Sequence, residues 1–142
     1  MSSDSEIQLI PDDEQLSRFI LIKGWIRSDS NTVKSDAFIP QRDLNLSVTA
    51  CSQLSENDIW RVGQEVAQNR PDGTLRGRAD ILSLQVRQRL LQVISHPVQN
   101  NPNHVHITGW LSDKPAQKSI AQELTDAARF IPNPTLVISQ EE

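Results

Sequence analysis

The chain of 142 residues carries 14 basic and 18 acidic side chains, for a net charge of −4, and 37% of it is hydrophobic. This composition is typical of one globular domain and excludes a disordered or fibrous chain. No apolar stretch approaches the ~20 residues of a membrane-spanning helix. The single cysteine, Cys51, excludes an internal disulfide and a cysteine-rich zinc site. The polar residues 1–6 lack the pattern of a secretory signal, so we expect a cytoplasmic protein without a membrane partner.

The charge is unevenly distributed along the chain. Residues 1–14 hold five acids and no base, and Glu141 and Glu142 add two more acids at the other end. Residues 15–140 therefore carry 14 basic against 11 acidic side chains. The net negative charge of the chain therefore comes from its two ends. It does not exclude an acidic partner for residues 15–140.

The first elements expected in chain order are strands. The apolar run 18–22 predicts a strand, whereas residues up to about 15 show little periodicity and predict a flexible segment. The polar stretch 27–36 predicts a loop or the end of a hairpin, and 37–40 is a short apolar piece closed by proline. The alternation in 44–48 predicts a half-buried strand.

The first helix is predicted to begin at Ser55, a good N-cap with Asp58 three residues on. It is expected to end near Asn69, because Pro71 disfavours helix at the residue before it. Three short elements are expected to follow: a strand at 77–81, a short helix at 83–91 with Val86 and Leu90 turned inward, and a strand at 92–94.

The last elements are a strand and a longer helix. Residues 104–108 alternate between polar and apolar side chains and predict a strand. A helix is expected from about Lys114 to Arg129, with Pro115 in its first turn and Pro132 and Pro134 stopping it.

Together these elements predict an α+β fold. We expect a single domain at 16–131, with a mixed or antiparallel sheet, two main helices and one short helix. Residues 1–15 are expected to be a flexible acidic segment, and 132–142 a tail or an edge strand.

All three histidines lie between residues 96 and 106. His104 and His106 are two residues apart on an expected strand, so they share one face and could bind a metal or a phosphate together. A third metal ligand would have to be His96 or a distant carboxylate, and we predict no metal site. Residues 105–108 also match half of the two-histidine phosphoesterase signature, but that mechanism needs two copies and the chain has one.

Five arginines lie in the span 70–89, against two acids. They could bind phosphate or a partner's carboxylates, or they could be solvated and paired locally. No aromatic residue lies between Trp60 and Trp110, so the span lacks stacking platforms for single-stranded nucleic acid. We expect Trp110, at a strand end, to be exposed. The predicted partner- or anion-binding residues are Arg70, Arg76, Arg78, Arg87, Arg89 and Trp110.

Two short elements are specific enough to suggest a relationship: Ser-x-Ala-Phe-x-Pro at 35–40 and Asn-Pro-x-His at 101–104. With further pieces over roughly residues 16–130, the chain resembles a widespread group of uncharacterised small bacterial proteins. The resemblance marks which residues match the group, but it implies no activity. Members of such groups are typically small cytoplasmic companions of other gene products, which implies a role in binding a partner.

We therefore expect a non-enzymatic bacterial accessory protein, without a cofactor, that binds a partner protein through a face bearing arginine and tryptophan. Motifs for a nucleophile, a phosphate loop or a dinucleotide site are absent from the sequence. One alternative is a small enzyme or enzyme relic that acts on a phosphate or nucleotide. Its candidate catalytic residues are Ser35, Arg78, His104 and His106. A second alternative, RNA binding through the span 70–89, is possible but not favoured.

Overall fold

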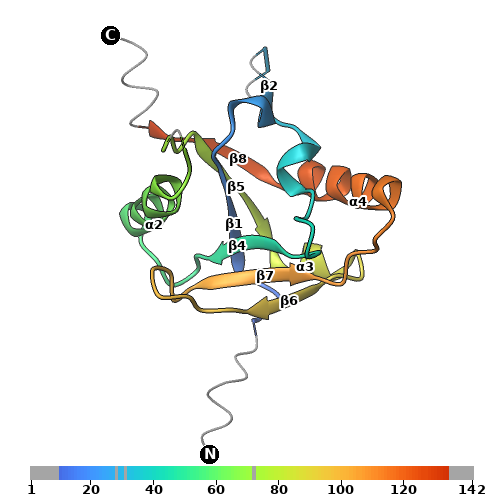
Figure 1. Cartoon of the computed structure of the whole chain (residues 1–142). Coiled ribbons are helices and arrows are strands. Elements are labelled where there is room, and N and C mark those ends of the chain that lie inside the picture. The colour runs from blue at the N-terminus through green and yellow to red at the C-terminus, as the bar shows by residue number, and fades with distance from the viewer. Residues whose placement is uncertain (1–9, 28, 31, 72, 135–142) are drawn as a thin grey trace, which may run out of the picture.

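A six-stranded antiparallel sheet organises the structure, a computed structural model that describes residues 10–27, 29–30, 32–71 and 73–134 (Figure 1). The strand order is β6-β7-β4-β1-β5-β8, and β2 and β3 form a separate hairpin. The bounds of the strands are β1 Gln15–Ile20, β2 Ile26–Arg27, β3 Thr32–Val33, β4 Leu46–Ala50, β5 Gly77–Leu82, β6 Gln92–Ser95, β7 His104–Thr108 and β8 Arg129–Pro132.

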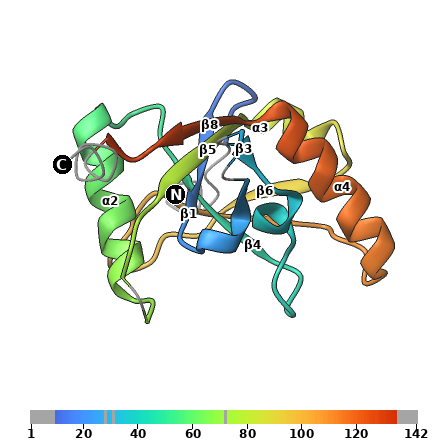
Figure 2. The same cartoon turned by 90° about the horizontal axis from the view of Figure 1, so that it is seen from above.

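Helices cover both faces of this sheet. Helix α2, Glu56–Gln68, lies on one side, and α4, Lys114–Ala127, lies on the other (Figure 2). The shorter helical elements are α3 Ser83–Arg87 and the 3₁₀ turns η1 Lys23–Trp25 and η2 Ser35–Phe38. The predicted α+β class is confirmed. None of the helices within the described ranges is long and apolar enough to cross a membrane.

The caps of the two long helices follow the sequence closely. The hydroxyl of Ser55 accepts from the amide of Asp58, as predicted, and the carboxylate of Asp113 accepts from the amide of Ala116. The prediction that the second helix runs to Arg129 is wrong, because the chain is extended from Ala128 and Arg129 begins β8. Pro132 lies within β8, where an edge strand can accommodate the missing N–H.

The segment before β1 is bonded to the domain. The flexibility expected up to residue 15 stays a prediction, and the structure shows how residues 10–15 contact the domain. Amides of Ser83 and Leu84 donate to the backbone oxygens of Glu14 and Asp12, each at 2.9 Å, and β1 already begins at Gln15. Residues 1–9 and 135–142, which include the rest of the predicted acidic segment and tail, lie outside the described ranges.

The end of α3 also differs from the prediction. The helix stops at Arg87, and Leu90 has a left-handed backbone with φ of 65°. This conformation turns its side chain outward, 88% exposed, so the prediction that Leu90 faces inward is wrong. Leu91 is the buried residue at this point, whereas Val86 is buried as predicted.

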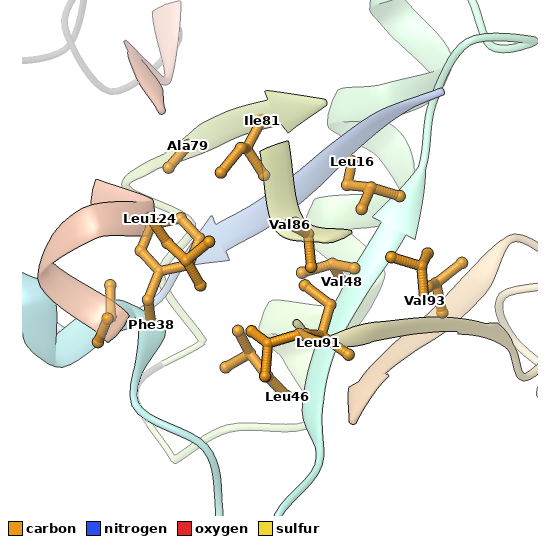
Figure 3. Packing of buried hydrophobic residues seen from close by; sticks show 14 of the residues in the cluster. Leu16, Phe38, Leu46, Val48, Ala79, Ile81, Val86, Leu91, Val93 and Leu124 are labelled. Carbon is orange, nitrogen blue, oxygen red and sulfur yellow. The ribbon is translucent and has the colours of Figure 1, made fainter. Parts of the chain in front are cut away.

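Two hydrophobic layers hold the sheet between the helices. On the α4 face, one cluster packs Leu16 and Leu46 against residues from η2 and α4, such as Phe38 and Leu124 (Figure 3). On the α2 face, a smaller cluster joins Phe19 to residues of α2 and the loop after it, including Ile59, Ala67 and Leu75. Each large apolar side chain buried in this way stabilises the fold by about 1.5–3 kcal/mol.

Candidate functional site

A cavity opens where two central strands separate. Strands β1 and β4 pair only at Leu16 with Ala50 and at Ser17 with Thr49, and they diverge beyond these positions. The resulting cavity, of about 390 Å³, lies between the sheet, the C-terminal end of α2 and the loop that joins β6 to β7. Its polar lining includes Arg18, Trp25, Glu65, Asn69, Arg70 and His104.

Arg18 bridges the gap between the diverging strands. Its Nε donates to the carbonyl of Ala37 at 2.7 Å, and its Nη1 donates to the carbonyl of Ser47 at 3.0 Å. The guanidinium lies 5.0 Å from the centre of the Trp25 ring. Within the described residues it has no carboxylate partner. Because a guanidinium has five N–H donors, about three remain for a ligand in the cavity.

The cavity wall carries more positive than negative charge. Burial, together with the nearby charge of Arg70, lowers the pKa of Arg18 to about 10. Arg70 follows the C-terminal end of α2, where the partial negative charge of the helix favours a cation. Glu65 is the one carboxylate among the side chains that line the cavity, and it forms no ion pair within the described residues.

The Asn-Pro-x-His element fixes one wall of the cavity. Asn101 is buried, and its Nδ2 donates to Oγ1 of Thr49 at 2.9 Å. Its Oδ1 accepts from the amide of Asn103 at 3.1 Å, and its backbone oxygen accepts from the amide of His104 at 3.2 Å. Asn101 therefore holds the loop against β4 and positions His104 at the start of β7.

The three histidines form one cluster. The amide of His96 donates to the carbonyl of His104 at 2.8 Å, which extends the β6–β7 pairing and places the two residues opposite each other. The rings of His96 and His106 are stacked with centroids 4.0 Å apart. The predicted shared face of His104 and His106 is confirmed by their contact, with ring centroids 4.9 Å apart. His96 joins them only through the strand pairing.

The surroundings of His104 and His106 favour the neutral form of each imidazole. Burial and the charge of His96 lower the pKa of His104, although a hydrogen bond to the backbone of His96 opposes this change. Burial and the charges of the other two histidines lower the pKa of His106, opposed by the charge of Asp43. Nδ1 of His104 lies 2.8 Å from the carbonyl oxygen of His96. Because a carbonyl can only accept, that nitrogen carries the proton.

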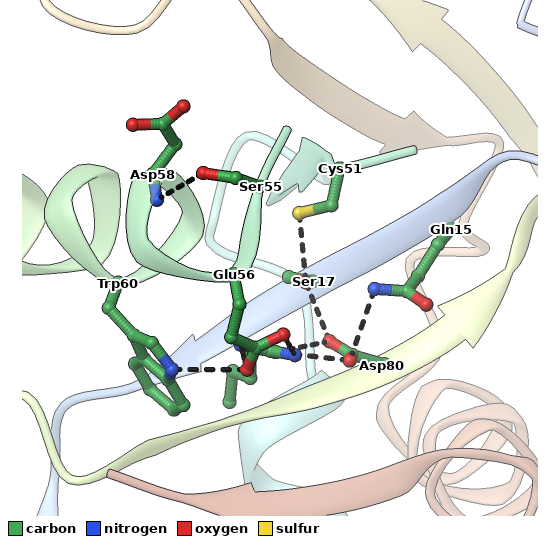
Figure 4. Close-up of polar contacts among 9 residues, drawn as sticks. Gln15, Ser17, Cys51, Ser55, Glu56, Asp58, Trp60 and Asp80 are labelled. Carbon is green, nitrogen blue, oxygen red and sulfur yellow. Dashed lines mark hydrogen bonds and ion pairs between the residues drawn. The ribbon is translucent and has the colours of Figure 1, made fainter. Parts of the chain in front are cut away.

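Arg78 belongs to a separate, buried network under α2. Figure 4 shows its partners Glu56 and Asp80, together with Trp60. It is 3% exposed, and its guanidinium donates to Glu56 at 2.9 Å and to Asp80 at 3.0 Å. It also lies 4.7 Å from the centre of the Trp60 ring. Burial lowers the pKa of Arg78, but the bonds to Glu56 and Asp80 outweigh that effect and raise it. Each of the three guanidinium nitrogens of Arg78 thus donates to a carboxylate of the protein itself.

Cys51 ends the same network. Its thiol donates to the hydroxyl of Ser17 at 3.0 Å, and that hydroxyl donates to Asp80 at 2.6 Å. Burial raises the pKa of Cys51 to about 11, so the thiol is protonated near neutral pH. A protonated, buried thiol is a poor nucleophile, which agrees with the lack of a nucleophile motif in the sequence.

The other residues of the predicted partner- or anion-binding set do not form one face with Arg78. Arg87 pairs with Asp12 at 2.7 Å and Arg89 with Glu123 at 3.3 Å, both beside α3. Arg76 directly precedes β5, and its amide donates to the carbonyl of Ile20. The prediction that Trp110 is exposed is wrong: it is 5% exposed, and its Nε1 donates to the carbonyl of Ile107.

The candidate catalytic set is also spread over the fold. Ser35 is buried in η2, which packs with α4, whereas the histidines lie on the α2 side of the sheet. Strands β4 and β1 separate β7 from β5, which carries Arg78. Three strand spacings of about 4.8 Å place the two strands about 14 Å apart. The structure therefore brings His104 and His106 together and leaves Ser35 and Arg78 elsewhere.

Arg18, Trp25 and Arg70 are the cavity residues that matter most, and sequence reasoning named only Arg70 as a binding residue. A signal for Arg18 was present, since a charged residue inside an apolar strand must find buried partners. Comparison with known proteins adds no assignment: no protein-family model, no curated protein and no solved structure matches the chain.

Proposed function

We propose that this chain is a non-enzymatic binding protein whose cavity takes up a small organic anion. The observation that carries the proposal is the pairing of Arg18 with two neutral carbonyls, beside a second arginine and an aromatic ring. The contacts that hold Arg18 fix its position and leave its charge uncompensated.

Uncompensated charge favours an anionic ligand. A partly buried cation loses hydration, and neutral carbonyls restore only part of the lost stabilisation. A second cation nearby raises the cost of the charged state further, as the pKa of Arg18 of about 10 indicates. A carboxylate or phosphate that enters the cavity would compensate both arginines through charge-assisted hydrogen bonds.

The lining also restricts the rest of the ligand. Trp25 is partly exposed at the cavity and offers a surface for a planar ring, and Asn69 offers an amide. The volume of about 390 Å³ lies within the range of about 300–1,000 Å³ that is usual for small-molecule sites. A phosphate or carboxylate attached to an aromatic ring, or a mononucleotide, has the chemistry that these residues recognise.

Thermal unfolding with phenyl phosphate, benzoate and neutral phenol tests the proposal. Both anions are expected to raise the Tm of the full chain, and phenol is expected to leave it unchanged. Arg70→Gln removes one charge from an exposed position and is expected to weaken anion binding by about 10–100-fold, since a bond to a charged group contributes about 1.5–3 kcal/mol. Arg61→Gln, at an exposed arginine on α2 and outside the cavity, is the control. Equal effects of phenol and phenyl phosphate would contradict the proposal.

Binding of a partner protein, the function expected from the sequence, is the second candidate. It is supported by two exposed leucines: Leu90 is 88% and Leu111 is 60% exposed. The backbone segments that carry them approach each other at Gly109, where an added Cβ would lie 3.6 Å from the carbonyl oxygen of Leu90. Exposed apolar side chains that form one patch are a common feature of protein interaction sites.

Affinity purification with the wild type and with Leu90→Ser/Leu111→Ser tests this candidate. A partner that is retained in equimolar amount by the wild type and lost from the double variant would support it. Leu84→Ser, at an exposed leucine on α3, is the control and should retain the partner. Equal retention by all three proteins would refute the role of the leucines.

A further inference from the structure

We propose that His96, His104 and His106 form a binding site for a divalent transition metal ion of the zinc class. One potential ligand nitrogen from each residue lies within 4.8 Å of the others. These are all the histidines of the chain, and the fold gathers them at one end of the β6–β7 pair.

The backbone that carries the three rings is held in place. His104 and His106 lie in β7, which is paired on both sides, with β4 and with β6. His96 is bonded to His104 immediately beyond β6. In a tetrahedral site, two nitrogens bound to zinc at about 2.0–2.1 Å are about 3.4 Å apart. The rings are exposed or half-buried, so rotation about their side-chain torsions can bring the nitrogens to this separation without moving a strand.

The contact between His104 and His96 prepares a ligand. Nδ1–H of His104 donates to the carbonyl of His96 at 2.8 Å, so the lone pair of His104 lies on Nε2. A histidine that binds a metal commonly donates its other ring N–H to a carbonyl or carboxylate, which fixes the tautomer and the ring orientation. The protein already has this bond in place.

The donor atoms of the cluster also suit a transition metal. Imidazole nitrogen favours Zn²⁺, Cu²⁺, Ni²⁺ and Co²⁺ over Mg²⁺ and Ca²⁺, which prefer oxygen. Three protein ligands leave at least one coordination position for water or another ligand.

This site adjoins the proposed anion site and shares only His104 with it. His104 lines the cavity that contains Arg18, whereas His96 and His106 are not among the residues that line it. A substitution of His96 or His106 therefore tests the metal site without removing a cavity residue.

Titration of the full chain with ZnSO₄, after removal of trace metals with EDTA, tests the proposal. NMR of the three histidine rings is expected to show all three shifting together and saturating at one equivalent of Zn²⁺. Losing an outer-sphere partner of a metal ligand costs about 10–100-fold in affinity, so losing a ligand itself is expected to cost at least as much. His96→Gln and His106→Gln should each weaken binding by about tenfold or more, and circular dichroism should show that each remains folded.

Two controls separate this site from general cation binding. Mg²⁺ at the same concentration should leave the histidine resonances unchanged, because it prefers oxygen ligands. Cys51→Ser should bind Zn²⁺ like the wild type, since the buried thiol is outside the cluster. The proposal is overturned if Zn²⁺ shifts fewer than three rings, if Mg²⁺ has the same effect, or if His96→Gln binds like the wild type.

Discussion

Replacing Arg78 by methionine tests whether this arginine has a structural role under α2. Methionine keeps most of the length and apolar contact of the side chain and removes the charge. The change leaves Asp80, whose side chain is 9% exposed, with hydrogen bonds from Ser17 and Gln15 but without a cation. It also removes the contact with the Trp60 ring.

The expected loss of stability comes mainly from the Asp80 pair. Removing one partner of a buried ion pair costs about 3–5 kcal/mol, because the other charge stays buried without compensation. The bond to Glu56 adds little, about 0–1 kcal/mol, since the Glu56 side chain is 63% exposed and screened by water. We therefore expect Arg78→Met to lower the free energy of unfolding by about 3–5 kcal/mol, a large part of the 5–15 kcal/mol usual for a domain.

Urea unfolding followed by tryptophan fluorescence measures this loss, and a double-mutant cycle assigns it. Asp80→Asn removes the buried negative charge and keeps a side chain that can bond to Ser17. If the two charges interact, Arg78→Met/Asp80→Asn should be more stable than the sum of the single changes predicts, with a coupling energy of about 1–3 kcal/mol. Phenyl phosphate binding by the folded Arg78→Met variant should be unchanged, because Arg78 does not line the cavity.

Two results would refute this reasoning. A loss below about 1 kcal/mol for Arg78→Met would mean that the pair does not stabilise the fold, and additivity within about 0.5 kcal/mol would mean that the two charges do not interact. Loss of anion binding without loss of stability would return Arg78 to the set of ligand-binding residues.

Three further changes test other parts of the fold. Burial raises the pKa of Cys51 from 9.0 to about 11, so its contribution to stability is complete below pH 9 and is lost as the pH rises toward 11. For the same reason, a thiol reagent at pH 8 should react far more slowly with the folded chain than with the chain unfolded in urea. The bond from Arg78 lowers the pKa of Glu56, so its contribution is present above the usual value of 4.5 and is lost on acidification; Glu56→Gln should flatten the acid side of the pH–stability curve. Gly63→Ala should destabilise the chain by about 1–3 kcal/mol, because the new Cβ would lie 2.7 Å from the Phe19 ring; a gain in stability from helix propensity alone would contradict the packing at this position.

Local patterns in the sequence were enough to predict most of the helices and strands. The capping pattern at Ser55 defined the start of α2, and the alternation of 104–108 defined β7, because both depend on neighbouring residues. The errors arose where contacts with distant parts of the chain determine the secondary structure. Arg129 continues the helical pattern of the sequence, but in the structure it lies opposite Asp80 in the antiparallel pairing of β8 with β5. Leu90 fits the period of a longer helix, but α3 ends at Arg87.

The sites depend on pairings between distant segments, so the sequence revealed them only in part. The shared face of His104 and His106 follows from the two-residue period of a strand, whereas the position of His96 depends on the β6–β7 register. The arginines of the span 70–89 are neighbours in sequence, but a helix end, a strand and a second helix carry them to different contacts. RNA binding through that span stays a prediction.

The location of both proposed sites follows from the widths of a helix and a sheet. A helix about 10 Å across covers about two strands spaced about 4.8 Å apart. On its face of the sheet, α2 packs over β1 and β5 through Phe19 and Arg78. Strands β4 and β7 extend past it and place Ser47, Thr49, His104 and His106 on the same face, since direct partners across antiparallel strands point to one side. Ser47, His104 and His106 are half-buried on this face, where no helix covers them, whereas Thr49 is buried and bonded to Asn101. The cavity lies at the border between the covered and uncovered strands, where β1 leaves β4, and the histidine cluster lies on the uncovered part beyond it.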